Sequence, residues 1–253
     1  MQFSRTLVVS TAMTLTVVVG LIGWDAATTT TATSATAGTS TAPGVANRTG
    51  SASSLPQTTA QGAPVTSDTA VVTIGDSIMA GHGLDDPSDA WPVLLGTETG
   101  QAVTNDSCSG AGFIAVGDCG TDYDGLLAAA VASAPGTVLV ESSDNDLGQD
   151  PTALAAATTS TIAALHAALP HARIVGLSTL WDQPGTVPDE VAASSADLQH
   201  AVQAVGGTYI DVGQPIATGA GLLQADSEHP TDAGQQVLAT AVLADLRAAG
   251  IEG

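Results

Sequence analysis

The chain has 253 residues, of which 25 are Asp or Glu and only 4 are Lys or Arg, so its formal net charge is −21. This balance argues against binding to nucleic acids or anionic membrane surfaces, because both require basic patches that pair with phosphates. The length suits one α/β domain with a buried core, together with additional sequence outside that domain.

Residues 1–24 are predicted to be a signal peptide or a membrane anchor. Arg5 precedes an apolar run over residues 6–24 that contains no charged residue, as in the n- and h-regions of exported proteins. The run is also long enough to cross a bilayer, although its Thr and Ser residues weaken such a span. We therefore expect an exported protein, secreted or held at the cell surface, whose membrane attachment, if any, is through this segment.

Residues 25–69 are predicted to be a disordered linker. The segment consists largely of Thr, Ala, Ser, Gly and Pro and has almost no large apolar residue. It cannot bury enough surface to offset the conformational entropy that ordering would cost.

Residues 70–253 are predicted to form the folded domain. Short apolar, β-branched runs predict strands at residues 70–74, 101–105, 137–141, 173–177 and 208–212. Ala- and Leu-rich segments between them predict helices at residues 89–99, 123–134, 151–169, 188–205 and 231–249, and Pro135-Gly136, Pro170 and Gly206-Gly207 are expected to stop helices. The alternation predicts an α/β fold, a three-layer α/β/α sandwich with a mostly parallel, five-stranded sheet. In such a fold, ligands bind at the carboxyl ends of the strands.

Two motifs at opposite ends of this domain could supply a nucleophile and its base. Ser77, in Gly75-Asp76-Ser77, follows the first predicted strand, where a strand turns into a helix and the hydroxyl is exposed. A serine needs a base to take its proton. His229 lies in a loop before the last helix, and Asp226 could curl back to accept a hydrogen bond from its ring. Each motif alone would also suit an ordinary turn or surface loop.

Two further segments could stabilise a developing negative charge. Gly110 follows the second predicted strand, and Asn145 follows the third. The backbone N–H groups of Ser77 and Gly110, together with the side-chain amide of Asn145, would form an oxyanion hole, as acyl transfer requires.

This set of residues resembles the four sequence blocks of the SGNH hydrolases, the GDSL-like esterases and lipases. The blocks are Gly75-Asp76-Ser77, Gly110, Asn145 with Asp146, and Asp226-x-x-His229, and they cover the chain from about Val71 to its C-terminus. The resemblance implies a flavodoxin-like fold, a catalytic triad of Ser77, His229 and Asp226, and an oxyanion hole of Ser77, Gly110 and Asn145. It also implies ester hydrolysis through an acyl-enzyme without a metal or cofactor.

One residue departs from the family pattern. The third block usually begins with glycine, and this chain has Ser143 there. We expect a modest backbone adjustment, which leaves the placement of Asn145 open.

Cys108 and Cys119 are predicted to form one disulfide in an oxidising compartment, with two buried free thiols as the alternative. Their spacing does not suit a zinc site, which needs four ligands. A disulfide would enclose Gly110 and stiffen the oxyanion loop, contributing about 2–3 kcal/mol by loop-closure arithmetic.

The substrate is less well specified than the chemistry. Met79 and His82, close after Ser77, and Trp181, after the fourth strand, are candidates for the substrate pocket. We expect a monomer that acts on a small-molecule or polysaccharide ester, with short acyl groups on a carbohydrate, a small lipid or another alcohol. The alternatives are an acyltransferase that uses the same triad and a non-catalytic cell-surface binding module.

Overall fold

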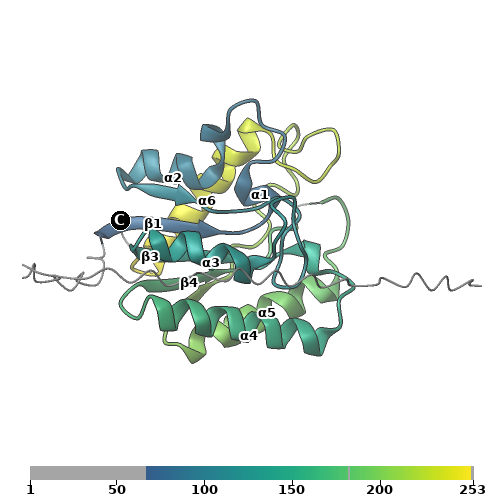
Figure 1. Ribbon diagram of the computed structural model, residues 1–253. Helices are drawn as coiled ribbons and strands as arrows, with labels where there is room; N and C mark the ends of the chain where they lie inside the picture. Colours follow the sequence, from purple (N-terminus) through teal and green to yellow (C-terminus); the bar gives the residue numbers. More distant parts are fainter. Residues whose placement is uncertain (1–66, 182, 252–253) are drawn as a thin grey trace, which may run out of the picture. The chain divides into compact units, whose positions relative to one another are not determined.

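The computed structural model describes residues 67–181 and 183–251 (Figure 1). The predicted signal peptide or anchor and nearly all of the predicted linker lie outside the described residues. The first strand, β1 (Ser67–Ile74), begins before the predicted start at residue 70, because Ser67 already pairs with Pro135 of the neighbouring strand. No helix within the described ranges is long and apolar enough to cross a membrane.

A parallel sheet of five strands in the order β2-β1-β3-β4-β5 forms the middle layer. The other strands are β2 (Val103–Asn105), β3 (Pro135–Glu141), β4 (Arg173–Leu177) and β5 (Thr208–Ile210). The helices are α1 (Ser77–Ala80), α2 (Trp91–Thr99), α3 (Tyr123–Ala132), α4 (Pro151–Ala168), α5 (Asp189–Ala204) and α6 (Asp232–Ala248), and the 3-10 turns are η1 (Pro87–Asp89) and η2 (Asp144–Asp146). This arrangement confirms the predicted three-layer fold.

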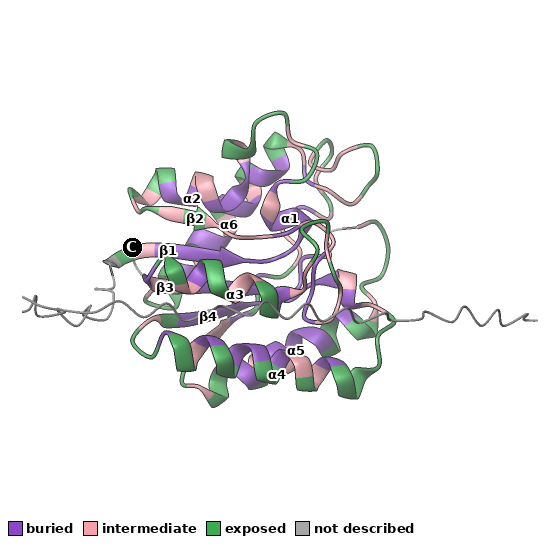
Figure 2. Cartoon of the chain, viewed as in Figure 1, coloured by how far each residue is buried: buried purple, intermediate pink, exposed green. Residues whose placement is uncertain are grey.

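Helices cover both faces of the sheet. Because successive side chains of a strand point to opposite faces, Val71 packs in one core cluster with Trp91 of α2 and Leu238 of α6. Its neighbour Val72 packs in a second cluster with Ile162 of α4, together with residues of α3 and α5. In Figure 2 the strands are mostly buried, whereas α4 and α5 expose their outer faces.

Acidic and hydroxyl side chains begin several of the helices. Asp76, Asp122, Asp150 and Thr231 each accept a backbone N–H from the first turn of α1, α3, α4 and α6, respectively. Such caps satisfy amide groups that have no partner inside the helix, and a carboxylate there also suits the positive end of the helix dipole. Some of the many aspartates of the chain therefore serve as N-caps of helices.

Pro135-Gly136 follows a helix, as predicted, and it also begins a strand. Helix α3 ends at Ala132, and Pro135 is the first residue of β3. A proline is tolerated at the first position of a strand, where its missing N–H matters least. The helix expected to begin at Ser77 is α1, which is only four residues long, too short for its end to be predicted from a helical period.

Candidate active site

Ser77 lies just beyond the carboxyl end of β1, which is an interior strand of the sheet. The Asp76 carboxylate accepts the N–H of Ile78 at 3.0 Å, so Ser77 becomes the first residue of α1. A Cβ on Gly75 would lie 2.5 Å from the sulfur of Met79, so a larger residue at this position would force Met79 to move. Ser77 is largely buried, with 7 % of its surface exposed. The strand-to-helix turn thus fixes the backbone on which the hydroxyl stands.

The structure brings Ser77, His229 and Asp226 together in one hydrogen-bonded chain. His229 Nε2 lies 2.9 Å from Ser77 Oγ, and His229 Nδ1 lies 2.9 Å from Asp226 Oδ2. With its proton on Nδ1 donated to Asp226, the ring leaves Nε2 to accept the Ser77 hydroxyl proton. The hydrogen bond from His229 is the main reason why the pKa of Asp226 falls to about 2.

The loop before α6 folds tightly around the Asp226 carboxylate. Asp226 Oδ1 accepts the backbone N–H groups of Glu228 and His229 at 3.0 and 3.1 Å. Ser227 adopts a φ of 64°, and the N–H of Gln224 donates to the carbonyl of His229 at 2.7 Å. The backbone therefore curls back over three residues, as the spacing of Asp226 and His229 predicted.

Gly110 lies in the loop between β2 and α3, beside the end of β1. The N–H of Cys108 donates to the carbonyl of Gly75 at 2.9 Å, which ties the start of the loop to the turn that carries Ser77. Gly110 has a φ of 78°, in the left-handed region that favours glycine. Within the described residues, the N–H groups of Ser77 and Gly110 donate no hydrogen bond. Both groups are therefore available to a ligand.

Asp146 anchors the same loop, a role that the sequence did not reveal. Its carboxylate accepts three consecutive backbone N–H groups, those of Phe113, Ile114 and Ala115, at 2.7, 3.0 and 2.9 Å. A Cβ on Gly112 would lie 2.5 Å from this carboxylate. The only signal in the sequence was the position of Asp146 next to Asn145, because the amides that it binds come from a distant segment.

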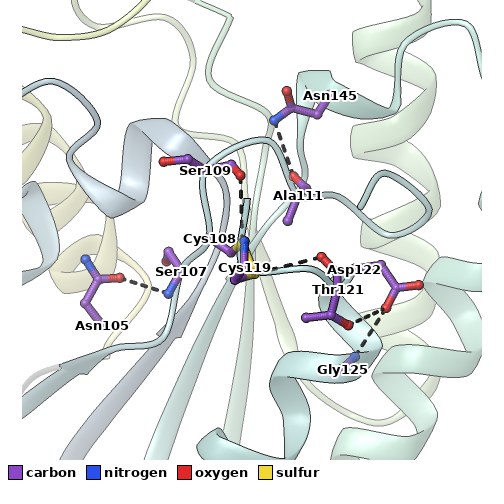
Figure 3. The surroundings of a disulfide bond; sticks show 10 residues. All are labelled: Asn105, Ser107, Cys108, Ser109, Ala111, Cys119, Thr121, Asp122, Gly125 and Asn145. Carbon is purple, nitrogen blue, oxygen red and sulfur yellow. Dashed lines mark hydrogen bonds between the residues drawn. A yellow bond between two sulfur atoms is a disulfide. The ribbon is translucent and has the colours of Figure 1, made fainter. Parts of the chain in front are cut away.

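The disulfide between Cys108 and Cys119 is present, which confirms the predicted pairing (Figure 3). It closes a loop that contains Gly110 and includes a further backbone bond from Asp118 N–H to the carbonyl of Ser109 at 2.8 Å. Covalent and hydrogen-bonded constraints therefore both act on this segment.

Asn145 lies next to Ala111 of the same loop (Figure 3). Its Nδ2 donates to the carbonyl of Ala111 at 3.3 Å and to Ser143 Oγ at 3.0 Å. Ser143 Oγ in turn donates to Asp76 Oδ2 at 2.7 Å. The residues predicted to form an oxyanion hole are thus linked to one another and to the turn that carries Ser77.

The three candidates for the substrate pocket have different surroundings. The prediction that Met79 lines the pocket is wrong, because its side chain is fully buried in the core next to Gly75. His82 is exposed, and its ring lies 4.4 Å from that of His229, centroid to centroid, with a tilt of 41°. Trp181 is half-buried, and its backbone N–H donates to Gln214 Oε1 at 2.7 Å. His82 therefore borders the triad, whereas no hydrogen bond or ring contact joins Trp181 to the triad among the described residues.

Two buried carboxyl groups lie close to the triad. Burial raises the pKa of Asp76 to about 6 and that of Asp144 to about 7. The negative charges of Asp76 and Glu228 raise the pKa of Asp144 further, and Gln183 Nε2 donates to its carboxylate at 3.4 Å. The surroundings of the triad are consequently acidic. Among the described residues, no group of three or more His, Cys, Asp or Glu side chains is arranged to hold a metal ion.

A Ser–His–Asp chain at the carboxyl edge of a parallel sheet, next to unpaired backbone N–H groups, is the arrangement of a serine hydrolase. Residues 73–237 match the model of the GDSL-like Lipase/Acylhydrolase family, and the chain belongs to this family. A search of curated proteins finds no match.

Solved structures share the fold of this chain. The structure of TesA has 26 % sequence identity and a TM-score of 0.57, over 71 % of this chain and 98 % of that chain. The psychrotrophic esterase EstA from Pseudoalteromonas sp., inhibited by monoethylphosphonate, has 19 % identity and a TM-score of 0.59, over 72 % and 98 %. A family two carbohydrate esterase from Cellvibrio japonicus has 16 % identity and a TM-score of 0.58, over 73 % of this chain and 62 % of that chain. The fold and the family together make this protein a carboxylic ester hydrolase.

Proposed function

We propose that the protein is a serine esterase that cleaves its substrate through an acyl-enzyme on Ser77. The observation that carries the proposal is the continuous hydrogen-bonded chain from Ser77 Oγ through the His229 ring to Asp226, with both distances at 2.9 Å. These are the contacts that activate a serine hydroxyl and stabilise the imidazolium formed when it reacts.

In the first half of the reaction, Ser77 Oγ bonds to the ester carbonyl carbon while its proton moves to His229 Nε2. The carbonyl oxygen becomes an oxyanion, which accepts hydrogen bonds from the N–H groups of Ser77 and Gly110 and from the Asn145 amide. The ester C–O bond then breaks, and the proton on His229 passes to the departing alkoxide. Asp226 holds the ring in the required tautomer throughout.

In the second half, water attacks the acyl-enzyme and gives one proton to His229. A second tetrahedral intermediate collapses, the bond to Ser77 Oγ breaks, and His229 returns the proton to the serine. The products are one carboxylic acid and one alcohol, and no metal or cofactor takes part in these steps.

We infer a neutral substrate with a short acyl group on a carbohydrate or another polyol. Asp76, Asp144 and Glu228 surround the triad with acidic groups, which disfavours anionic substrates. A cavity of about 550 Å³ lies at the same edge of the sheet as Ser77, where β4 and β5 end, although no residue of the triad lines it. Its polar lining includes Ser178, Thr179, Ser195, Gln199, Tyr209 and Asp211. Such a lining suits the hydroxyl groups of a sugar better than a long acyl chain.

The decisive experiment compares Ser77→Ala with Ser88→Ala, an exposed serine outside the site. With p-nitrophenyl acetate as substrate, we expect Ser77→Ala to lose activity at least about a thousandfold, whereas Ser88→Ala retains it. A fluorophosphonate probe should label the wild-type chain on Ser77 and leave Ser77→Ala unlabelled. Full activity of Ser77→Ala would refute the proposal, and an unlabelled, inactive wild type would favour a binding module.

Substrate preference is tested on the same proteins. We expect p-nitrophenyl acetate and butyrate, and an acetylated sugar polymer, to be cleaved faster than p-nitrophenyl octanoate or palmitate. Product analysis with an added alcohol separates the alternatives, because an acyltransferase yields a new ester where a hydrolase yields free acid. A preference for the long chains would contradict the inference about the acyl group.

We further propose that the protein is exported and works as a monomer. The disulfide between Cys108 and Cys119 supports export, since such bonds persist in oxidising compartments. Ser77, His229 and Asp226 all come from one chain, so the site needs no second copy. Fluorophosphonate labelling of fractionated cells should find the active protein outside the cytosol, and sedimentation should give the mass of one chain.

A further inference from the structure

Ser143, which stands where the family usually has glycine, makes three hydrogen bonds inside the site. It lies between β3 and η2, and only 1 % of its surface is exposed. Its hydroxyl donates to Asp76 Oδ2 at 2.7 Å. The same oxygen accepts the backbone N–H of Asn145 at 3.1 Å and the Asn145 side-chain Nδ2 at 3.0 Å.

These contacts use the full hydrogen-bonding capacity of the hydroxyl. A serine hydroxyl has one donor hydrogen and two acceptor lone pairs, and all three are used here. Asp76 is itself fixed, because its other oxygen accepts the N–H of Ile78 at the start of α1. A continuous chain of hydrogen bonds therefore runs from the helix that carries Ser77, through Asp76 and Ser143, to the amide of Asn145.

The two hydrogens of the Asn145 amide are held unequally. One is bound by Ser143 Oγ at 3.0 Å, which fixes the plane of the amide, and the other meets the carbonyl of Ala111 at 3.3 Å. Hydrogen bonds of this kind weaken as the distance grows, so the contact with Ala111 is the easier one to exchange. Ala111 directly follows Gly110, so the exchangeable hydrogen points at the loop that is expected to hold the oxyanion.

We propose that Ser143 is a positioning residue for ester cleavage. Its hydroxyl orients the Asn145 amide toward the oxyanion and holds that amide at a fixed position relative to Ser77. The proposal rests on the proposed esterase function and goes beyond it, since the family resemblance assigns no role to a side chain at this position. An oxyanion, being charged, attracts the N–H more strongly than the Ala111 carbonyl does, while Ser143 keeps its hold on the other hydrogen.

The variants Ser143→Ala and Ser143→Gly both remove the hydroxyl. Loss of an oxyanion donor lowers turnover by about a hundredfold or more. In each variant the Asn145 amide remains but its orientation is no longer fixed, so kcat should fall by about tenfold. KM should stay within about twofold, because the amide acts on the transition state and not on the bound ester. Using both variants keeps the test valid if one of them folds poorly.

Ser142→Ala is the matched control. Ser142 is also fully buried, but its hydroxyl pairs with Ser194 Oγ of α5 at 2.6 Å, and no hydrogen bond from its side chain to Asn145 is present. We expect Ser142→Ala to shift the melting temperature as much as Ser143→Ala does while leaving kcat near the wild-type value. An equal loss of kcat in both variants would show a general packing effect and overturn the proposal.

A double-mutant cycle with Asn145→Ala gives the sharper test. If Ser143 acts through the Asn145 amide, Ser143→Ala should cost about tenfold in the wild-type background and nothing further in the Asn145→Ala background. The same tenfold loss in both backgrounds, or no loss in the wild-type background, would overturn the proposal. Failure of the esterase function would be recognised separately, because the wild type itself would then release no acid from p-nitrophenyl acetate.

Discussion

Asp226 is the most exposed member of the triad, with 44 % of its side chain accessible, against 14 % for His229. Water therefore screens its charge, and its effect on His229 depends mainly on the direction of the hydrogen bond. The tight turn through Ser227 supplies that direction, because it presents Oδ2 to the ring and Oδ1 to two backbone N–H groups.

At this residue we expect Asp226→Asn to lower kcat by about 10²–10⁴-fold with p-nitrophenyl acetate. An amide in this place can donate to His229 Nδ1, which moves the ring proton to Nε2 and leaves no acceptor for the Ser77 hydroxyl. Glu228→Gln is the control, because among the described residues no side-chain hydrogen bond or ion pair joins Glu228 to the His229 ring. If Asp226→Asn retained activity within about threefold, the assigned role of Asp226 would be wrong.

His82 contacts the triad through its ring, which packs against the ring of His229. We expect His82→Phe to preserve this ring contact and to keep kcat/KM near the wild-type value at neutral pH, whereas His82→Ala should lower it about two- to fivefold by letting the His229 ring move. Steady-state kinetics of both variants would check this. Equal losses in the two variants would show that the ring contact is irrelevant.

At the scale of elements, the segment between β2 and α3 has almost no regular structure, yet it has to hold Gly110 still. The Asp146 carboxylate and the Cys108–Cys119 disulfide restrain it at two separate places. Both restraints can be removed one at a time.

Asp146→Asn should destabilise the fold by at least about 2 kcal/mol, because three backbone N–H groups lose a charged acceptor and one oxygen becomes a donor. Urea unfolding would measure this change, and Asp118→Asn, an exposed residue of the same segment, is the control. We also expect kcat to fall, since Gly110 belongs to the freed loop. Unchanged stability would show that these hydrogen bonds contribute little.

Replacing both Cys108 and Cys119 by Ser should lower the free energy of unfolding by about 2–3 kcal/mol. Closing the loop reduces the entropy of the unfolded chain, and that reduction is lost with the bond. Treatment of the wild type with a thiol reductant should give the same shift in the urea midpoint. A midpoint that does not move would contradict the predicted stiffening.

The same elements show what the sequence could and could not predict. Strand β4 has its predicted bounds, Arg173–Leu177, because a buried central strand is one continuous apolar run. Met79 was misjudged, because proximity to Ser77 in the sequence does not show that a helix only four residues long turns the side chain into the core. Ser143 and Asp146 were recognised only as members of a block, because their partners come from segments that only the folded chain brings near.

For the molecule as a whole, two buried carboxyl groups make the free energy of unfolding depend on pH. Asp76 and Asp144 have folded-state pKa values of about 6 and about 7, raised mainly by burial, whereas an unfolded Asp titrates near about 4. Between these values the folded state binds more protons than the unfolded state, so its stability falls as the pH rises from about 4 to about 7. Asp226 acts in the opposite sense, because its lowered pKa favours the fold above about pH 4 and the benefit disappears toward pH 2.

We therefore expect Asp144→Asn to flatten the decline in stability between pH 5 and pH 7.5, measured by urea unfolding in about 0.5 M NaCl. The salt screens the general repulsion within a chain of net charge −21, so that the buried group dominates the difference. Asp118→Asn, which removes an equal but exposed charge, should leave the slope unchanged. Parallel slopes for the wild type and Asp144→Asn would contradict the assignment.

The proposed nucleophile and its proposed base come from opposite ends of the described domain: Ser77 follows the first strand, and His229 precedes the last helix. During synthesis Ser77 leaves the ribosome first, and the proposed mechanism can activate it only after His229 has folded against it. Under the proposed mechanism, hydrolysis therefore reports that the two ends of the domain have come together, and a fragment truncated between the two residues is expected to be inactive. A fluorogenic ester would then follow the folding of this chain in real time, with the enzyme serving as its own probe.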